Sequence, residues 1–338
     1  MRSKYILMAV ALVIALGTTQ CKKKKKSDPI MGCTDPNSLS YNPDATQDDG
    51  SCTYASAPAM NTLTELFAAL GAQPQTVTVS ATSASTVTVN GVKIEVPANA
   101  FLTTSGGSTI TGVASLTVKT ILTKSEIILS GAGANSSNSK LISTKGCVKA
   151  TAAQNSQSLR LGGGGNFFVN VPDGVTMPPP NKKFYAPKVT ATDSTAKWAL
   201  GTDVTDIPIV FDGTKYQHRA SLDSLKWLNC GVQWDSTAAT KVAVTASVTA
   251  SMFNSTNTAI YLSFNNRLIV GALFQISSGI FRISNMPQGV AVNMVAISVI
   301  NGQFYSAILP MNITSTTQNL TMVPVSQSTM LSQIAALP

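Results

Sequence analysis

Three patterns of hydrophobic and polar residues follow one another along the 338-residue chain. An unbroken apolar run from Tyr5 to Leu16 comes first and spans about 12 residues, far fewer than the roughly 20 that cross a bilayer as a helix. A polar stretch to residue 57 separates this run from a short segment with helical spacing of apolar residues. From Gln75 onward, short runs of alternating apolar and polar residues predict β-strands almost to the C-terminus.

The strand-like runs are rich in β-branched residues and are separated by turn residues. Asn90-Gly91 is a strong signal for a two-residue hairpin turn, and the glycines at 162–165 indicate another turn. Strands are predicted at 76–80, 86–89, 92–96, 113–122, 146–152, 159–161, 167–171, 184–187, 197–200, 216–219, 259–264, 281–284, 290–299 and 304–309. This spacing favours a mainly β fold of tandem antiparallel β-sandwich domains.

Two helices are expected. The first is a linker helix over residues 58–71, where four apolar residues lie at helical spacing: Leu63, Leu66, Phe67 and Leu70. The second covers 326–337 and carries an apolar stripe that is expected to pack on the last β-domain. No other helix is predicted before the C-terminus.

Charged residues make up 12% of the chain, about half the usual share. The formal net charge is +9, but Arg2, Lys4 and Lys22 to Lys26 supply seven of the 24 basic residues, which leaves 17 bases against 15 acids. A nucleic-acid-binding protein carries its basic residues as a patch on a folded domain. The sequence indicates no such patch, so no nucleic-acid partner is expected.

The N-terminus has a basic head, an apolar core and a polar end, which is typical of a signal peptide. Cys21 directly after that core resembles the lipobox of bacterial lipoproteins, although Gln20 stands where lipoboxes carry a small residue. The resemblance implies a signal peptide over 1–20, a lipid anchor at Cys21 with a Lys-rich linker over 21–31, and a place in the outer membrane on either of its faces. Plain secretion and a retained membrane anchor are the alternatives.

With Cys21 lipidated, four cysteines remain, and an oxidising compartment permits disulfides. Cys33 and Cys52 bracket a segment too short and polar for a core, so they are expected to pair. For Cys147 and Cys230, a disulfide and two buried thiols are equal alternatives.

Residues 32–54 are rich in Asp and Asn, whose oxygens are ligands that Ca²⁺ prefers. The segment resembles a cysteine-bracketed, Asp-rich repeat of surface proteins of Bacteroidetes-type bacteria, distantly like thrombospondin type-3 calcium repeats. The resemblance implies a Ca²⁺ site with four candidate ligands: Asp35, Asp44, Asp48 and Asp49. The alternative is a disulfide-tied turn whose acids are solvated and cap turns. No other cofactor is expected.

Two further resemblances concern the β-region. The run 91–101, Ile127 to Gly131, and the Gly-rich turn before Phe167 make residues 75–172 similar to the ZU-type β-sandwich shared by ankyrins and netrin receptors. That family implies an interaction or scaffold module without catalytic residues. The run 279–289 resembles the transthyretin-like or carboxypeptidase-regulatory sandwich, which implies a second sandwich of this or an Ig-like kind over 241–338.

Between these modules, residues 173–240 form a β-rich extension with all three tryptophans. Trp227 and Trp234 either lie buried at a domain seam or form an aromatic platform for a glycan. His218, the only histidine, is expected at the surface. No catalytic residue is identified.

The sequence thus predicts a non-enzymatic, lipid-anchored scaffold, adhesin or binding module of the cell envelope, which meets a protein or glycan at the cell surface. One alternative is a carbohydrate-binding lipoprotein with Trp-lined loops. Another is a hydrolase whose fold brings two carboxylates to within about 5–10 Å of each other.

Overall fold

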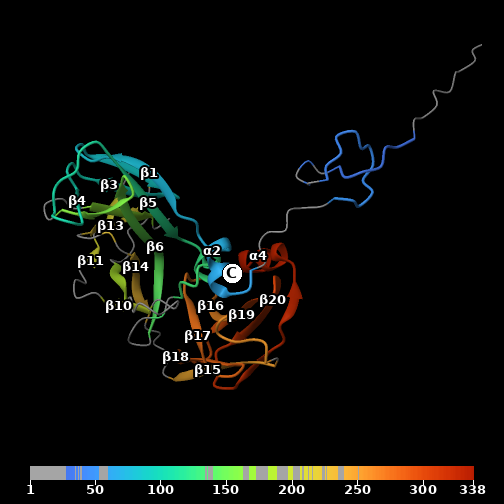
Figure 1. Ribbon diagram of the computed structural model, residues 1–338. Helices are drawn as coiled ribbons and strands as arrows, with labels where there is room; N and C mark the ends of the chain where they lie inside the picture. Colours follow the sequence, from blue (N-terminus) through green and yellow to red (C-terminus); the bar gives the residue numbers. More distant parts are fainter. Residues whose placement is uncertain are drawn as a thin grey trace, which may run out of the picture. The chain divides into compact units, whose positions relative to one another are not determined.

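The computed structural model describes residues 28–34, 36, 38, 40–52, 60–133, 135, 140–162, 167–172, 182–188, 197–200, 206–207, 209–211, 213–214, 216–222, 225, 227–234, 240–249 and 251–338. Only the backbone is described at 182–188, 197–200, 206–207 and 222. The chain forms two compact units that divide after Pro58. Figure 1 shows the second unit as two β-modules, the first in cyan to yellow and the second in orange to red.

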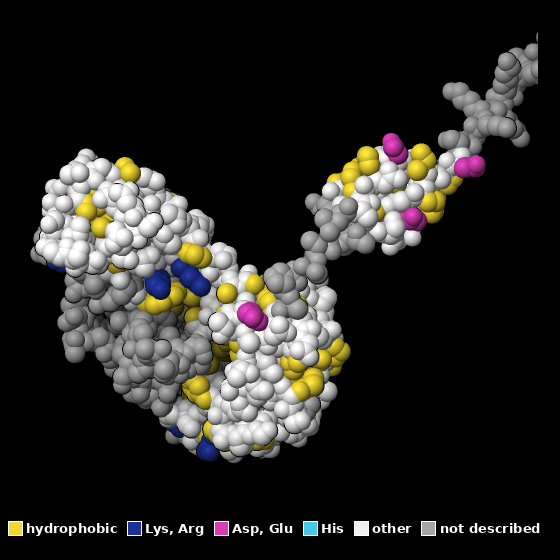
Figure 2. All heavy atoms as spheres, in the orientation of Figure 1, with side chains coloured by type: hydrophobic (Ala, Val, Ile, Leu, Met, Phe, Trp, Pro, Cys, Tyr) yellow, Lys and Arg dark blue, Asp and Glu magenta, His cyan; other side chains and the backbone are white. Residues whose placement is uncertain are grey.

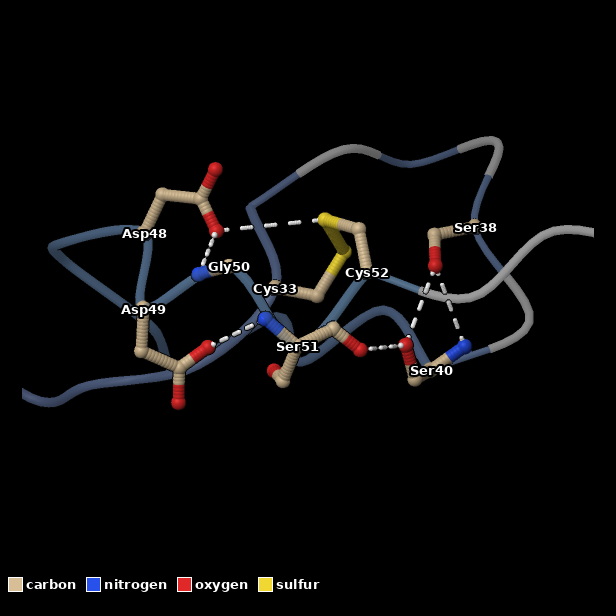
Figure 3. The surroundings of a disulfide bond; sticks show 8 residues. All are labelled: Cys33, Ser38, Ser40, Asp48, Asp49, Gly50, Ser51 and Cys52. Atoms are coloured by element: carbon tan, nitrogen blue, oxygen red, sulfur yellow. Dashed lines mark hydrogen bonds between the residues drawn. A yellow bond between two sulfur atoms is a disulfide. The ribbon is translucent and has the colours of Figure 1, made fainter.

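The first unit is an irregular segment closed by a disulfide between Cys33 and Cys52 (Figure 3). Their Cα atoms lie 4.7 Å apart, and the pairing confirms the prediction. The backbone N–H of Asn42 donates to the carbonyl of Cys33 at 2.9 Å. Cys33 and Ser38 are the buried side chains among the residues described in this unit. The disulfide therefore does the work that a hydrophobic core does in larger domains.

The first β-module is a sandwich of two sheets in which every described pairing is antiparallel. The larger sheet has the order β1-β5-β6-β14-β9-β10, with β4, β7 and β11 attached. Its strands are β1 (Gln75–Ser80), β4 (Phe101–Thr103), β5 (Val113–Ile121), β6 (Leu141–Gln154), β7 (Gln157–Leu161), β9 (Lys182–Lys188), β10 (Lys197–Leu200), β11 (Asp206–Ile207) and β14 (Trp227–Trp234). The smaller sheet has the order β12-β13-β8-β3-β2. It contains β2 (Ser85–Val89), β3 (Val92–Val96), β8 (Phe167–Pro172), β12 (Ile209–Phe211) and β13 (Tyr216–Leu222).

The hairpin between β2 and β3 has the predicted turn. Val89 pairs with Val92, and the two residues between them, Asn90 and Gly91, have φ of 49° and 80°. Asparagine and glycine tolerate this left-handed backbone, and its twist matches that of the flanking strands.

Alternate residues of both sheets meet in one core, which includes Ile94, Leu116, Val148, Phe167 and Ala220. Strands β13 and β14 come from the stretch 173–240, and each pairs with a strand of the stretch 75–172. The extension therefore completes both sheets of the first sandwich.

The second module contains β15 (Lys241–Val248), β16 (Thr258–Phe264), β17 (Val270–Ser277), β18 (Ile280–Pro287), β19 (Ala291–Ile300), β20 (Gln303–Asn312), β21 (Gln318–Leu320) and β22 (Val323–Val325). Their order is β21-β15-β18-β17-β16-β19-β20-β22. The pair β15–β21 is parallel. Strand β17 pairs with β16 as far as Leu273 and with β18 from Phe274. This change of partner folds the sheet over a core of its own, which includes Leu262, Phe281 and Met294.

Three helices are described: α2 (Leu63–Leu70), α3 (Lys124–Leu129) and α4 (Gln327–Ala335). The first and last lie where helices were predicted, but the expectation of no further helix was wrong. Thr123 and Glu126 form a capping box at the start of α3, in which each side chain accepts a hydrogen bond from the other residue's backbone N–H. Among the described residues, no helix has the length and apolar character needed to cross a membrane.

Helix α3 lies in a hydrophobic cluster to which both β-modules contribute, here called the seam. The first module supplies Ile128 and Ile142, and the second supplies Tyr261, Val295 and Met330. Hydrogen bonds also cross it, among them two donated by the first module. Lys124 Nζ donates to the carbonyl oxygen of Phe264 at 2.6 Å. The backbone N–H of Thr144 donates to the carbonyl oxygen of Leu268 at 3.2 Å. Helix α4 packs in this seam, and so contacts both modules rather than the last domain alone.

The alternative of a Cys147–Cys230 disulfide is wrong. On the paired strands β6 and β14, Cys230 lies opposite Gly146, whereas Cys147 lies opposite Asn229. Cross-strand partners share a face and sequence neighbours do not. The two thiols therefore point to opposite faces of the sheet, Cys230 into the sandwich core and Cys147 into the seam.

We expect native protein to resist thiol alkylation at Cys147 and Cys230, because both are buried and burial raises the pKa of the Cys147 thiol to about 12. In denaturant without reductant, peptide mass spectrometry should find both labelled and Cys33 and Cys52 still linked. A peptide that joins Cys147 to Cys230 would contradict the assignment.

We also expect Ile128→Ala to lower the free energy of unfolding by about 2–4 kcal/mol, because it leaves a cavity in the seam. Both modules should then unfold together at a lower temperature in calorimetry. The control is Ile276→Ala, whose side chain is 58% exposed and which should change stability by less than about 0.5 kcal/mol. Loss of one module with the other unchanged would show that the seam does not couple them.

Candidate functional site

The Asp-rich segment uses its described carboxylates to close turns (Figure 3). Asp48 Oδ1 accepts from the backbone N–H of Gly50 at 3.1 Å, and Asp49 Oδ1 accepts from that of Ser51 at 2.9 Å. The bonds from Ser51 lower the pKa of Asp49. Asp44 is exposed, and Asp35 lies outside the described residues. Within the described part of the chain, no three metal-ligating side chains lie together, and the arrangement is that of acids that cap turns.

The two tryptophans proposed as a glycan platform lie on β14 but on opposite faces of it. Their positions differ by seven, and side chains alternate along a strand. Trp227 packs against the seam, whereas Trp234 packs against the core of the second module and meets the ring of Phe264 edge-on at 4.9 Å. Trp227 and Trp234 therefore cannot form a single platform.

Trp227 instead belongs to a row of three side chains on the outer face of the larger sheet. Lys119 on β5 lies opposite Lys149 on β6, and Lys149 lies opposite Trp227 on β14. The Lys149 Nζ is 5.8 Å from the centroid of the Trp227 ring. We call these three residues the lysine row.

The lysine row lies at the rim of the seam. Two residues further along the paired strands β5 and β6, Ile121 and Cys147 lie opposite each other and are buried in the seam. Two residues from the row in the opposite direction, Thr117 pairs with Thr151. The hydroxyl oxygens of Thr76 and Thr117 lie 2.8 Å apart. An open face rich in hydroxyl groups thus adjoins the row.

Among the described residues, no acid forms an ion pair with either lysine of the row. The ion pairs that the structure describes both involve Glu95. Burial, and then the charge of Lys149, lower the pKa of Lys119. Figure 2 shows a visible face whose described side chains are mostly uncharged, with a few basic side chains that lie beside hydrophobic ones.

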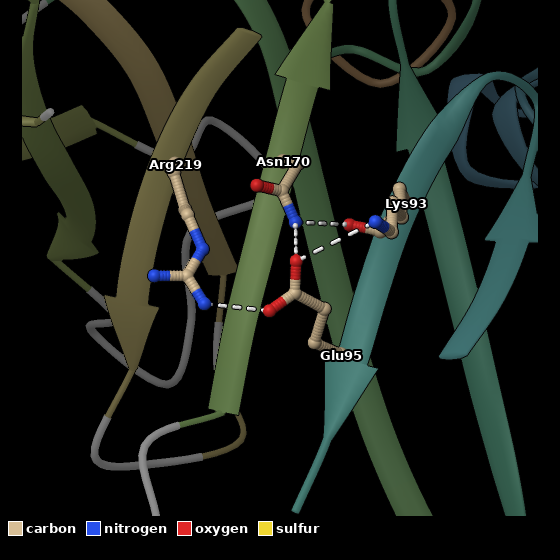
Figure 4. Close-up of polar contacts among 4 residues, drawn as sticks. All are labelled: Lys93, Glu95, Asn170 and Arg219. Atoms are coloured by element: carbon tan, nitrogen blue, oxygen red, sulfur yellow. Dashed lines mark hydrogen bonds and ion pairs between the residues drawn. The ribbon is translucent and has the colours of Figure 1, made fainter. Parts of the chain in front are cut away.

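A second polar group lies on the outer face of the smaller sheet (Figure 4). The Arg219 guanidinium donates to Glu95 Oε2 at 2.6 Å, and the Asn170 amide donates to Glu95 Oε1 at 3.1 Å. Arg219 also stacks on the ring of Phe168, with Cζ 3.5 Å from the centroid. Hydrogen bonding from Arg219 holds the pKa of Glu95 below its usual value. Because its side chains form hydrogen bonds with one another across β3, β8 and β13, this group stabilises the smaller sheet.

His218 is fully buried, so the expectation of a surface histidine was wrong. It shares a face of β13 with Ala220, which lies in the sandwich core. Alternation along the strand therefore turns His218 inward.

A hollow of about 820 Å³ lies beside α2 where β17 leaves β16. Its lining has no charged residue and combines hydroxyl, amide and aromatic groups, among them Thr64, Phe67, Thr256, Phe274 and Gln275. Neither this hollow nor the lysine row was predicted, because both depend on strand pairing that the sequence does not reveal.

Comparison of the chain with protein families, with curated proteins and with solved structures gives no match. The ZU-type, transthyretin-like and Asp-rich-repeat resemblances therefore stay predictions, as does the lipobox at Cys21, which lies outside the described residues.

We expect Glu95→Gln to destabilise the protein by about 0.5 kcal/mol at pH 7, since the pair with Arg219 is partly exposed to solvent. The folded-state pKa of Glu95 is lowered, so its contribution is complete above the unfolded value of about 4.3 and is lost as pH falls through the folded value. Denaturant titrations from pH 7 to pH 3 should show the difference between wild type and variant shrinking. Lys93→Met, which removes only the longer 3.8 Å contact, is the control, and a difference that grows in acid would contradict the assignment.

Proposed function

We propose that this protein is a lipid-anchored, non-enzymatic component of the outer membrane that acts as a scaffold, adhesin or binding module. The observation that carries the proposal is the Cys33–Cys52 disulfide, which closes a segment without a core soon after the leader. Disulfides persist in oxidising compartments, so this bond supports export. The apolar run before Cys21 and the lysines after it support an anchor at that cysteine.

The seam supports a binding role over a catalytic one. It joins the two β-modules through buried apolar residues and hydrogen bonds, which leaves the outer faces of the modules for contact with a partner. Shape complementarity on such faces needs no movement of the backbone.

The glutamates of the chain support the same conclusion. Glu65 and Glu126 each accept hydrogen bonds from backbone N–H groups that precede their helices. Glu95 is paired with Arg219. The three glutamates are thus held in structural roles, which disfavours them as the two carboxylates of a hydrolase site.

Glycan binding is the second candidate function, and the lysine row favours it. An indole beside Lys149, a second lysine on the next strand and a face of hydroxyl groups combine apolar and polar contacts on one surface. The site differs from the predicted Trp-lined loops, because it lies on strands and includes only Trp227.

We expect the mature, membrane-extracted protein to begin at Cys21 and to carry added acyl mass. Intact-mass spectrometry should show that mass lost in Cys21→Ser, which removes the thiol that the lipid modifies. Cys33→Ser is the matched control and should keep it. An unmodified chain that starts elsewhere would contradict the anchor and make plain secretion the better account.

A further inference from the structure

We propose that Lys119, Lys149 and Trp227 form a binding site for an acidic polysaccharide, whose carboxylate or sulfate groups meet the two lysines while one sugar ring lies on the indole. The proposal deepens the binding function proposed above and rests on it. It concerns only the ligand, so it can fail while the anchor at Cys21 stands.

The first argument is the arrangement of charge. Lys119 and Lys149 are direct cross-strand partners, and their Cβ atoms are thus about 4.5–5.5 Å apart. Like charges placed directly opposite each other destabilise a sheet. The structure describes no acid paired with either one. An anion held between the two ammonium groups would replace this repulsion with charge-assisted hydrogen bonds.

The partial burial of Lys119 strengthens the argument. Its side chain is half-buried, and burial is the main reason why its pKa is lowered. A cation that has lost part of its hydration interacts more strongly with a bound anion than a fully solvated one. Lys149 is exposed and supplies the more accessible contact.

The second argument is the indole beside the charges. Trp227 is partly exposed, and its apolar side is fixed by the seam. Ligand sites combine such an apolar aromatic surface with a few placed polar groups. A sugar ring offers both an apolar face of C–H groups and hydroxyls at its edge. The threonines next to the row, Thr117 and Thr151, give those hydroxyls partners on the same sheet face.

The charge of the whole chain favours an acidic glycan over a nucleic acid. Nucleic-acid binding uses many phosphate contacts and a basic patch or stripe. Here two lysines stand on a surface that is mostly neutral (Figure 2), and the main body has nearly equal numbers of bases and acids. Two cations and one ring match a ligand with one charge per sugar.

The experiment measures the affinity of the full chain for a short oligogalacturonate, with its methyl ester as the neutral matched probe. The double variant Lys119→Gln/Lys149→Gln should weaken binding by at least about tenfold, since it removes two charge-assisted contacts. The control Arg267→Gln/Arg282→Gln removes the same charge from two other exposed positions and should change binding less than about twofold. Wild-type protein should bind the methyl ester at least about tenfold more weakly than the acid.

Trp227→Phe tests the ring while keeping an apolar side chain in the seam, and it should weaken binding while the variant stays folded at the temperature of the assay. Equal losses in the two double variants would overturn the proposal and indicate general electrostatic attraction. Equal binding of acid and ester, tighter binding of a single-stranded oligonucleotide of equal charge, or no binding of either sugar would also overturn it.

Discussion

The structure depends on the burial of apolar residues in the seam between the two β-modules. Helix α3 is too short to be stable by itself in water, and it persists because Ile127, Ile128 and Leu129 are buried among side chains of both modules. One face of α2 and one face of α4 pack in the same cluster. The removal of apolar surface from water drives the association of the two modules. The hydrogen bond from Lys124 to the carbonyl of Phe264 adds a directional contact between them.

The seam also determines which part of the larger sheet stays open. Because it covers Ile121 and Cys147 but stops short of Lys119 and Lys149, the row of charges lies where the buried part of the sheet face ends. Trp227 belongs to both regions, with one side in the seam and the other beside Lys149. A residue that packs against the seam thus also borders the proposed ligand site.

Local patterns predicted most elements of the fold, whereas the pairing between them could not be predicted. The alternation of apolar and polar residues identified β3 and β5, and Asn90-Gly91 identified the hairpin between β2 and β3. Helix α3 was missed because three consecutive apolar residues are typical of a strand, although Thr123 and Glu126 carried the capping-box signal. The register of β6 against β14 determines which side chains meet. It places Cys147 and Cys230 on opposite faces of the sheet and Lys149 opposite Trp227. Sequence spacing contains no information on such non-local registers.

The pairing of β6 with β14 also affects how the chain can fold as it is made. Strand β14 ends at Trp234, and β13 from the same stretch pairs with β8 in the smaller sheet. A chain that emerges N-terminus first therefore keeps open edges on β6 and β8 until residue 234 has emerged, and open edges are where unwanted strand pairing begins.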